Sequence, residues 1–145
     1  MKVKFKRLDS RARYPSKATP GSAAYDLYSI ESTFIPPGVT ASVRTGLSIE
    51  IPEGWKGEIY SRSGLAYDGV VVSNSPGKID SDYRGEIKVL LYNNKNHCSQ
   101  GLIRIEAGSR VAQFEINPVQ DIEFEEVEDL SDTQRGEGGF GSTGE

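Results

Sequence analysis

The sequence consists of short runs in which apolar and polar residues alternate, with turn-forming residues between the runs. This alternation is clear over residues 47–51, 87–92 and 111–116. Apolar side chains at every second position indicate half-buried β-strands. The side chains expected to be buried are Leu47, Ile49, Ile51, Ile87, Val89, Leu91, Ala112, Phe114 and Ile116. Glycine and proline separate the runs, at Pro36-Pro37-Gly38, Pro52-Glu53-Gly54, Asp68-Gly69, Ser75-Pro76-Gly77 and Ala107-Gly108. Many short strands spaced in this way predict an antiparallel β-sandwich or barrel.

The same pattern leaves little room for helix. No stretch has the apolar period of a long amphipathic helix, and the best candidate for a brief helix is Ser63 to Tyr67. A chain of 145 residues is long enough for one domain whose core needs no disulfide or structural metal. The alternation stops after about Leu130, so we expect a β domain over residues 1–130 and a flexible glycine-rich arm over residues 131–145.

The charge balance bears on the class of ligand. The chain has 17 Lys and Arg against 21 Asp and Glu, and the acidic residues cluster between 121 and 132. A duplex nucleic-acid binder usually has a basic surplus, so we expect no nucleic-acid partner. An anionic small molecule needs only a few local cations. Cys98 is the only cysteine, which excludes an internal disulfide and fits a reducing, cytoplasmic compartment. We expect a soluble protein without secretory signal or membrane span.

Segment 77–85 combines carboxylates, an aromatic residue and two flanking glycines. One interpretation is a polar hairpin whose aspartates cap turns. The other is a ligand site in which Asp80 or Asp82 lies near a water molecule and Tyr83 forms an aromatic wall. Spacing alone does not decide between these two interpretations.

Two further segments each carry an arginine. Segment 61–65 precedes the brief helix and offers a phosphate group the guanidinium, hydroxyl and open backbone of Arg62, Ser63 and Gly64. An ordinary surface turn has the same pattern. Segment 108–113 begins a strand, and its Arg110 fits an exposed ion pair equally well.

The last segment, 135–144, contains one Arg, one Phe, a Ser-Thr pair and five glycines. A flexible tail explains the glycines but not Phe140, which favours docking. Backbone N–H groups freed by glycine suit an anion, and an aromatic ring can stack on a planar base.

The sequence lacks the residues that several other catalytic or binding sites require. His97 is the only histidine and lies in a polar segment beside Cys98, so a histidine-based triad or a zinc site is disfavoured. No Walker-type phosphate loop is present. What remains is direct attack by water, with a carboxylate as base and a phosphate-bound divalent ion.

In order along the chain, these segments resemble the five motifs of the trimeric dUTPase family, from about Gly21 to Gly144. The corresponding segments are 21–27, 61–65, 74–85, 108–113 and 135–144. The resemblance implies an all-β, distorted jelly-roll or sandwich-like barrel and a homotrimer with active sites at subunit junctions. It implies hydrolysis of dUTP to dUMP and diphosphate, which keeps uracil out of DNA and supplies dUMP for dTMP synthesis.

The resemblance also implies a role for individual residues. Asp80 would deprotonate the attacking water, Tyr83 would exclude a 2′-hydroxyl, and Asp26 would support the site. The nucleotide would be bound by Asn74, Gly77, Lys78, Ile79 and Lys88. The phosphates would be bound by Arg62, Ser63, Gly64 and Gln113. The arm, which in the family commonly comes from another subunit, would close over the nucleotide with Arg135, Phe140, Gly141, Ser142 and Thr143, and Phe140 would lie on uracil.

Magnesium is the expected cofactor. It prefers oxygen ligands and usually binds through substrate phosphates and water, so no direct protein ligand is expected. Two alternatives remain open at this point: a dCTP deaminase of the same fold, and a catalytically inactive β-sandwich that binds nucleotides.

The chain departs from the usual family pattern at four positions. Ser61 replaces proline, Ala24 replaces a frequent glycine, and Phe114 replaces a smaller aliphatic residue. Lys78 replaces an apolar residue, and its charge is expected to alter the electrostatics beside Asp80.

Overall fold

The computed structural model describes residues 1–95 and 101–139. The described strands are β1 (Lys4–Arg7), β2 (Tyr25–Tyr28), β3 (Thr33–Ile35), β4 (Thr40–Arg44), β5 (Leu47–Glu50), β6 (Trp55–Tyr60), β7 (Val70–Val72), β8 (Gly77–Ile79), β9 (Lys88–Asn93), β10 (Ile103–Ile105) and β11 (Arg110–Pro118). The one described helix, α1, spans Ser63–Tyr67 as the sequence predicts. No described helix has the length and apolar character needed to cross a membrane.

The strands form four small antiparallel sheets, with orders β1-β5, β10-β3, β2-β11-β6-β8 and β4-β9-β7. Neighbours within a sheet are mostly distant in sequence, as in a sandwich closed by long connections. Side chains from the four-stranded and three-stranded sheets share one core, which includes Leu27, Ile59 and Phe114 from the first and Val43, Val72 and Val89 from the second. The expected all-β sandwich-like fold is therefore confirmed.

In the runs 47–51, 87–92 and 111–116, the buried apolar side chains follow the alternation with one exception. Leu47, Ile49, Ile51, Ile87, Val89, Leu91, Ala112 and Phe114 are buried as expected, and Ile116 is partly buried against the core. Val111 falls on the polar side of the alternation but is fully buried. The pairing of β11 with β2 shifts register between Arg110 and Ala112, and such an irregularity turns consecutive side chains to the same face.

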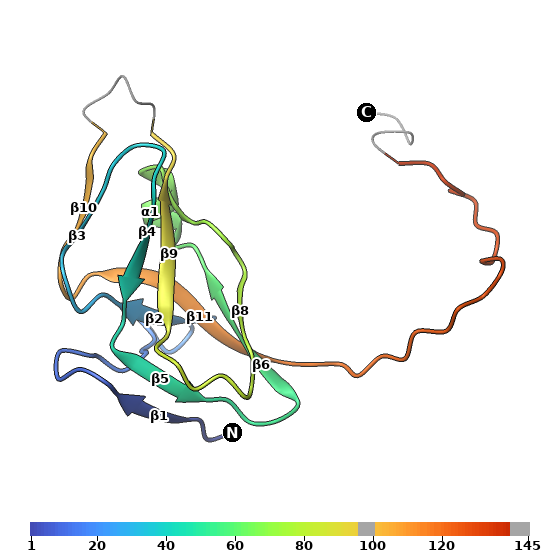
Figure 1. Ribbon diagram of the computed structural model, residues 1–145, viewed down its shortest axis with the longest axis horizontal. Coiled ribbons are helices and arrows are strands. Elements are labelled where there is room, and N and C mark those ends of the chain that lie inside the picture. The colour runs from blue at the N-terminus through green and yellow to red at the C-terminus, as the bar shows by residue number, and fades with distance from the viewer. Residues whose placement is uncertain (96–100, 140–145) are drawn as a thin grey trace.

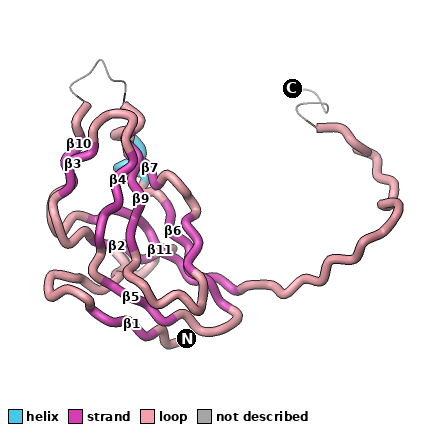
Figure 2. Tube along the Cα trace, in the orientation of Figure 1, coloured by secondary structure: helices cyan, strands magenta, loops and turns pink. Residues whose placement is uncertain are grey.

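The chain leaves the body of the fold at the end of β11 (Figures 1 and 2). Val119 is still tied to it, because its N–H donates to the carbonyl of Gly54 at 2.8 Å. Beyond it, the described residues 119–137 are exposed and form no strand or helix. The boundary expected after Leu130 stays a prediction.

The unusual size of Phe114 is matched by a glycine on the neighbouring strand. A Cβ atom at Gly57 would lie 2.6 Å from the ring carbon Cε2 of Phe114, which is closer than real contacts allow. The ring therefore fills the space that a side chain on β6 would occupy.

Gly57→Ala is expected to lower the free energy of unfolding by about 1–3 kcal/mol, because the added methyl overpacks the core. Urea unfolding measures this change. The double variant with Phe114→Leu should recover part of the loss. Gly21→Ala is the matched control, since a Cβ there meets no atom within 4 Å. Equal stability of Gly57→Ala and Gly21→Ala would contradict the packing argument.

Candidate active site

A buried carboxylate holds two arginines side by side. Asp26 on β2 is 5% exposed. Its Oδ1 lies 3.2 Å from Nε of Arg62, and its Oδ2 accepts a hydrogen bond from Nη1 of Arg110 at 3.3 Å. Nη1 of Arg62 also donates to the Arg110 carbonyl oxygen at 3.0 Å. Three segments far apart in the sequence therefore meet at one charged centre, the arginine centre, formed by Asp26, Arg62 and Arg110.

The strand pairing explains this meeting. β11 lies between β2 and β6, with Gln113 opposite Asp26 on one side and opposite Tyr60 on the other. Arg62 follows β6 directly and precedes α1. A buried carboxylate is costly to leave without a partner, so Asp26 fixes where both guanidinium groups lie, although the Arg62 and Arg110 side chains are themselves 23% and 46% exposed.

Ser63 and Gly64 lie exposed beside this centre at the start of α1. A Cβ at Gly64 would meet no atom within 4 Å, so the backbone there is open to a ligand. Ser61, which stands where the family usually has proline, accepts a hydrogen bond from the N–H of Val72 at 2.8 Å. This bond ties the segment to β7 and gives the departure a structural role.

A second group of candidate residues surrounds the end of β8. Asp80 follows β8 and is exposed, and its carbonyl accepts a hydrogen bond from the Tyr83 N–H at 3.2 Å. The Tyr83 hydroxyl donates to the carbonyl oxygen of Glu86 at 3.0 Å. Asn74 lies against Gly77, where a Cβ would come within 3.1 Å of its Nδ2. A compact turn thus presents a carboxylate and an aromatic ring together.

The remaining candidates are more dispersed. Lys88 is exposed on β9, opposite Arg44. Within residues 1–95 and 101–139, no hydrogen bond or ion pair joins the arginine centre to the Asp80 turn. Nε of Arg135 donates to the carbonyl of Gly138 at 2.6 Å. Phe140, Gly141, Ser142 and Thr143 lie outside the described residues, as do His97 and Cys98.

A family model described as dUTPase matches residues 10–144. The chain belongs to the dUTPase family. Among its relatives, the deoxyuridine 5'-triphosphate nucleotidohydrolase of Nautilia profundicola is 50% identical over 145 residues and covers 99% of each chain. That of Clostridioides difficile is 46% identical over 143 residues, covering 98% of this chain and 97% of its own.

Solved dUTPase structures share the fold. The dUTPase of Staphylococcus bacteriophage 80alpha with dUPNHPP has a TM-score of 0.90 at 31% identity, over 99% of this chain and 98% of that one. A mutant dUTPase from phage phi11 of S. aureus, described with a structural Mg(II) ion, has a TM-score of 0.81 at 27% identity, over 90% of this chain and 99% of that one.

Lys78 of this dUTPase is paired with a residue other than Asp80. Its ammonium hydrogen-bonds to Glu58, the residue opposite it in the β6–β8 register. Glu58 is 6% exposed and also accepts from Asn117 at 2.7 Å and from the Tyr60 hydroxyl at 3.1 Å. No ion pair of Asp80 occurs in the part of the chain that the structure describes. The charge of Lys78 is therefore balanced by Glu58, on the face of β6.

Sequence reasoning missed two features of this site. It could not decide whether Arg110 forms an exposed ion pair or takes part in the site. The structure pairs Arg110 with the buried Asp26. Sequence reasoning also did not single out Glu58, because nothing in the run 55–60 marks a buried carboxylate. Lysine residues are the only indication of a buried carboxylate that the sequence offers, because such a carboxylate needs a basic partner nearby.

Hydrogen bonds from Lys78, and then from Asn117, lower the pKa of Glu58 from 4.5 to about 2. A carboxylate whose folded-state pKa is depressed stabilises the fold above its ordinary pKa, and this contribution disappears as the pH falls toward the folded-state value. Glu58→Gln should therefore reduce the free energy of unfolding at neutral pH. The difference from wild type should shrink between pH 4.5 and pH 2.

Denaturant unfolding at several pH values measures this difference. Glu106→Gln is the matched control, since Glu106 pairs with Arg104 at the surface and is 55% exposed. An effect of Glu58→Gln that is equal at about pH 7 and about pH 3 would contradict the account.

Proposed function

We propose that this chain hydrolyses dUTP to dUMP and diphosphate by direct attack of water. The observation that carries the proposal is the centre formed by Asp26, Arg62 and Arg110, in a chain of the dUTPase family. The matching relatives are named as dUTP nucleotidohydrolases, so neither a dCTP deaminase nor an inactive binding module is favoured. The product dUMP is available for dTMP synthesis, and removal of dUTP keeps uracil out of DNA.

The arginine centre serves the phosphates. A nucleoside triphosphate carries about four negative charges near neutral pH, so stabilising its charge is the main catalytic requirement. Arg62 faces the triphosphate, with Ser63, Gly64 and Gln113 beside it. Asp26 does not repel the substrate, because its carboxylate is already balanced by two guanidinium groups.

Asp80 is the general base. It is exposed at the end of β8, so a water molecule can reach its carboxylate. The carboxylate takes a proton from that water as the oxygen attacks phosphorus, and the anhydride bond to the departing diphosphate breaks. General-base catalysis of this kind contributes roughly 10²–10⁴-fold to the rate.

The turn around Asp80 selects the nucleoside. Tyr83 lies against the deoxyribose and leaves no room for a 2′-hydroxyl. The backbone of Gly77, Lys78 and Ile79, together with Asn74 and Lys88, forms the rest of the nucleoside site. The side chain of Lys78 is directed to Glu58, so only its backbone takes part.

Magnesium fits this site as an ion carried by the substrate. No cluster of three His, Cys, Asp or Glu side chains occurs among residues 1–95 and 101–139, and the Asp26 oxygens are occupied by arginines. The donor set therefore suits an ion bound by phosphate oxygens and water. When bound, the ion neutralises charge on the phosphates.

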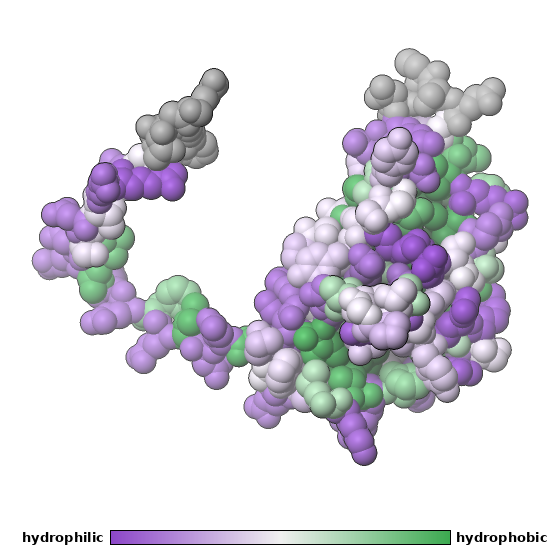
Figure 3. All heavy atoms as spheres, turned by 180° about the vertical axis from the view of Figure 1, so that it is seen from behind, coloured by the Kyte–Doolittle hydropathy of each residue, from purple (hydrophilic) through white to green (hydrophobic). Residues whose placement is uncertain are grey.

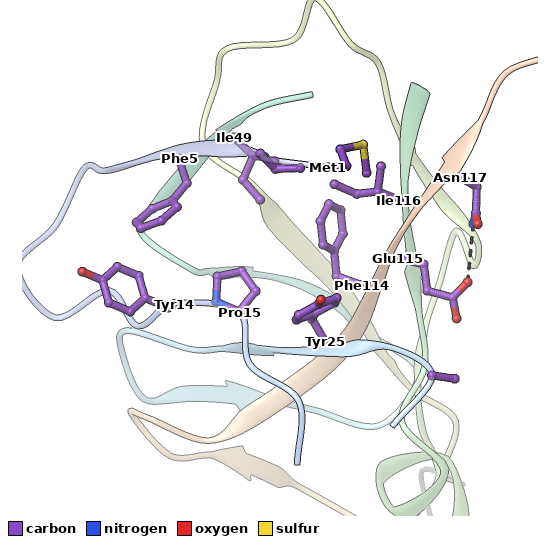
Figure 4. Close-up of a pocket in the computed structure, with 12 residues that line it drawn as sticks. Met1, Phe5, Tyr14, Pro15, Tyr25, Ile49, Phe114, Glu115, Ile116 and Asn117 are labelled. Atoms are coloured by element: carbon purple, nitrogen blue, oxygen red, sulfur yellow. Dashed lines mark hydrogen bonds between the residues drawn. The ribbon is translucent and has the colours of Figure 1, made fainter. Parts of the chain in front are cut away.

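The chain assembles as a homotrimer in which the segment that precedes the arm in one copy docks on the next copy. A groove of about 500 Å³ lies between β1, β5 and β11. Figure 4 shows Met1, Ile49, Phe114 and Ile116 along it. A hydrophobic area also lies on the body beside the base of the arm (Figure 3). The occupant we assign is the run 121–130 of a second copy.

The composition of the run 121–130 and of strand β1 supports this assignment. The run alternates acidic residues with exposed apolar ones, among them Ile122 and Phe124 at 66% and 88% exposure. The strand β1 alternates basic residues with Phe5 and pairs only with β5 among the described strands. The bond from Val119 to Gly54 directs the chain outward.

Docked in this way, the run 121–130 brings the arm that follows it to a neighbouring site. Arg135, Phe140, Gly141, Ser142 and Thr143 close over the bound nucleotide, with Phe140 on uracil. Closure excludes bulk water from the phosphates, retains the one water molecule held by Asp80, and strengthens the electrostatic contacts there.

Asp80→Asn should lower kcat for dUTP by roughly 10²–10⁴-fold while nucleotide affinity changes little, because the amide cannot accept the proton. Steady-state pyrophosphate release and titration with a non-hydrolysable dUTP analogue measure the two quantities. Asp68→Asn is the control, since Asp68 is an exposed carboxylate outside the site. Near-normal turnover of Asp80→Asn would remove this residue as the base.

Deletion of residues 131–145 should leave a folded trimer that hydrolyses dUTP poorly, because the docking run 121–130 is kept and the closing segment is lost. Analytical ultracentrifugation and pyrophosphate release test the two parts separately. Full activity of the truncated chain would show that the segment is only a flexible tail. A monomeric full-length chain would contradict the docking of the run 121–130.

A further inference from the structure

The turn that carries Asp80 and Tyr83 is bound to the strand connection 44–48. The two segments are joined by side-chain and backbone hydrogen bonds: Thr45 Oγ1 to the Ile87 carbonyl at 2.6 Å, the Ile87 N–H to the Leu47 carbonyl at 2.7 Å, and Ser48 Oγ to the Arg84 carbonyl at 2.8 Å. These bonds fix the ends of the turn but do not reach Tyr83 directly.

Glu86 completes the connection with a charged contact. Its carboxylate accepts from Nε of Arg44 at 3.1 and 3.2 Å and from the N–H of Gly46 at 2.9 Å. The side chain of Glu86 is only 12% exposed, against 40% for Arg44. Charge-assisted bonds to a largely buried carboxylate are among the stronger hydrogen bonds in proteins, so Glu86 is firmly placed.

Tyr83 takes its position from Glu86. Its hydroxyl donates to the carbonyl oxygen of Glu86 at 3.0 Å. Its ring also lies over Gly85, where an added Cβ would overlap the phenol. Any displacement of residue 86 therefore moves the acceptor that holds the far end of the Tyr83 ring.

We propose that Glu86 is a positioning residue that sets the preference for a deoxyribose over a ribose. The inference rests on the proposed function, in which Tyr83 excludes the 2′-hydroxyl. Steric exclusion of one hydroxyl requires the ring to be placed within a fraction of an ångström, and small displacements of a positioned group change rates strongly. The carboxylate of Glu86, clamped by Arg44 and Gly46, supplies that placement without touching the nucleotide.

The test compares kcat/KM for dUTP and for UTP in the full-length enzyme. Glu86→Ala should lower the ratio of the two values roughly tenfold, because a looser Tyr83 ring admits the 2′-hydroxyl. Glu86→Gln keeps an acceptor for the Gly46 N–H and should lose less than about threefold. Arg44→Ala removes the exposed one of the two groups that bind the Glu86 carboxylate, and we expect the ratio to fall about threefold.

Glu106→Ala is the matched control, because Glu106 also pairs with an arginine, at 3.0 Å on β10, but lies outside the proposed site. A loss of stability alone would lower both kcat/KM values together and leave their ratio unchanged. If Glu86→Ala does not fold, the ratio for Arg44→Ala decides.

Ratios within about twofold of wild type in Glu86→Ala, or in Arg44→Ala when the former does not fold, overturn the inference. In that case a wild-type chain that still prefers dUTP leaves the proposed function standing. A wild-type chain that does not cleave dUTP contradicts both.

Discussion

The site depends on the pairing of the buried Asp26 carboxylate with two arginines. Two guanidinium groups repel each other when they lie side by side, and Asp26 balances them with one oxygen each. The carboxylate in turn tolerates burial only because both partners are present. Since Arg62 precedes α1 and Arg110 begins β11, this one side chain also fixes how these elements meet around β2.

The four-stranded sheet β2-β11-β6-β8 contributes packing on one face and ion pairs on the other. Towards the core, Gly57 and Phe114 fit together. On the opposite face, the carboxylate of Glu58 forms ion pairs with both Lys56 and Lys78. Asp26 likewise pairs with both Arg62 and Arg110, and one positive charge of this centre is left over. We expect that charge, together with magnesium carried by the substrate, to meet the negative charge of the phosphates.

Much of the fold follows from local pattern. Within the runs 47–51, 87–92 and 111–116, period-two alternation identified the buried apolar side chains apart from Val111, and the turn sequences around 61–69 placed α1 correctly. Val111 was assigned to the wrong face because a register shift is a property of two paired strands, and one strand's sequence does not reveal it.

The candidate site was predictable only in part. Individual segments indicated an anion site and a carboxylate, and the order of five segments indicated the family. Which side chains pair across the fold was not visible, because Asp26 and Arg110 are separated by 84 positions and Glu58 and Lys78 belong to different strands. The clamp of Glu86 by Arg44 is of the same kind, a contact over 42 positions.

We expect this arrangement of charges to cleave dUTP. The decisive measurement is pyrophosphate release from dUTP by the purified wild-type chain, with and without magnesium. Turnover should require magnesium and exceed turnover of the other nucleoside triphosphates, and no ammonia should form from dCTP. Absence of pyrophosphate from dUTP in the presence of magnesium, or deamination of dCTP, would show that the charges serve another reaction.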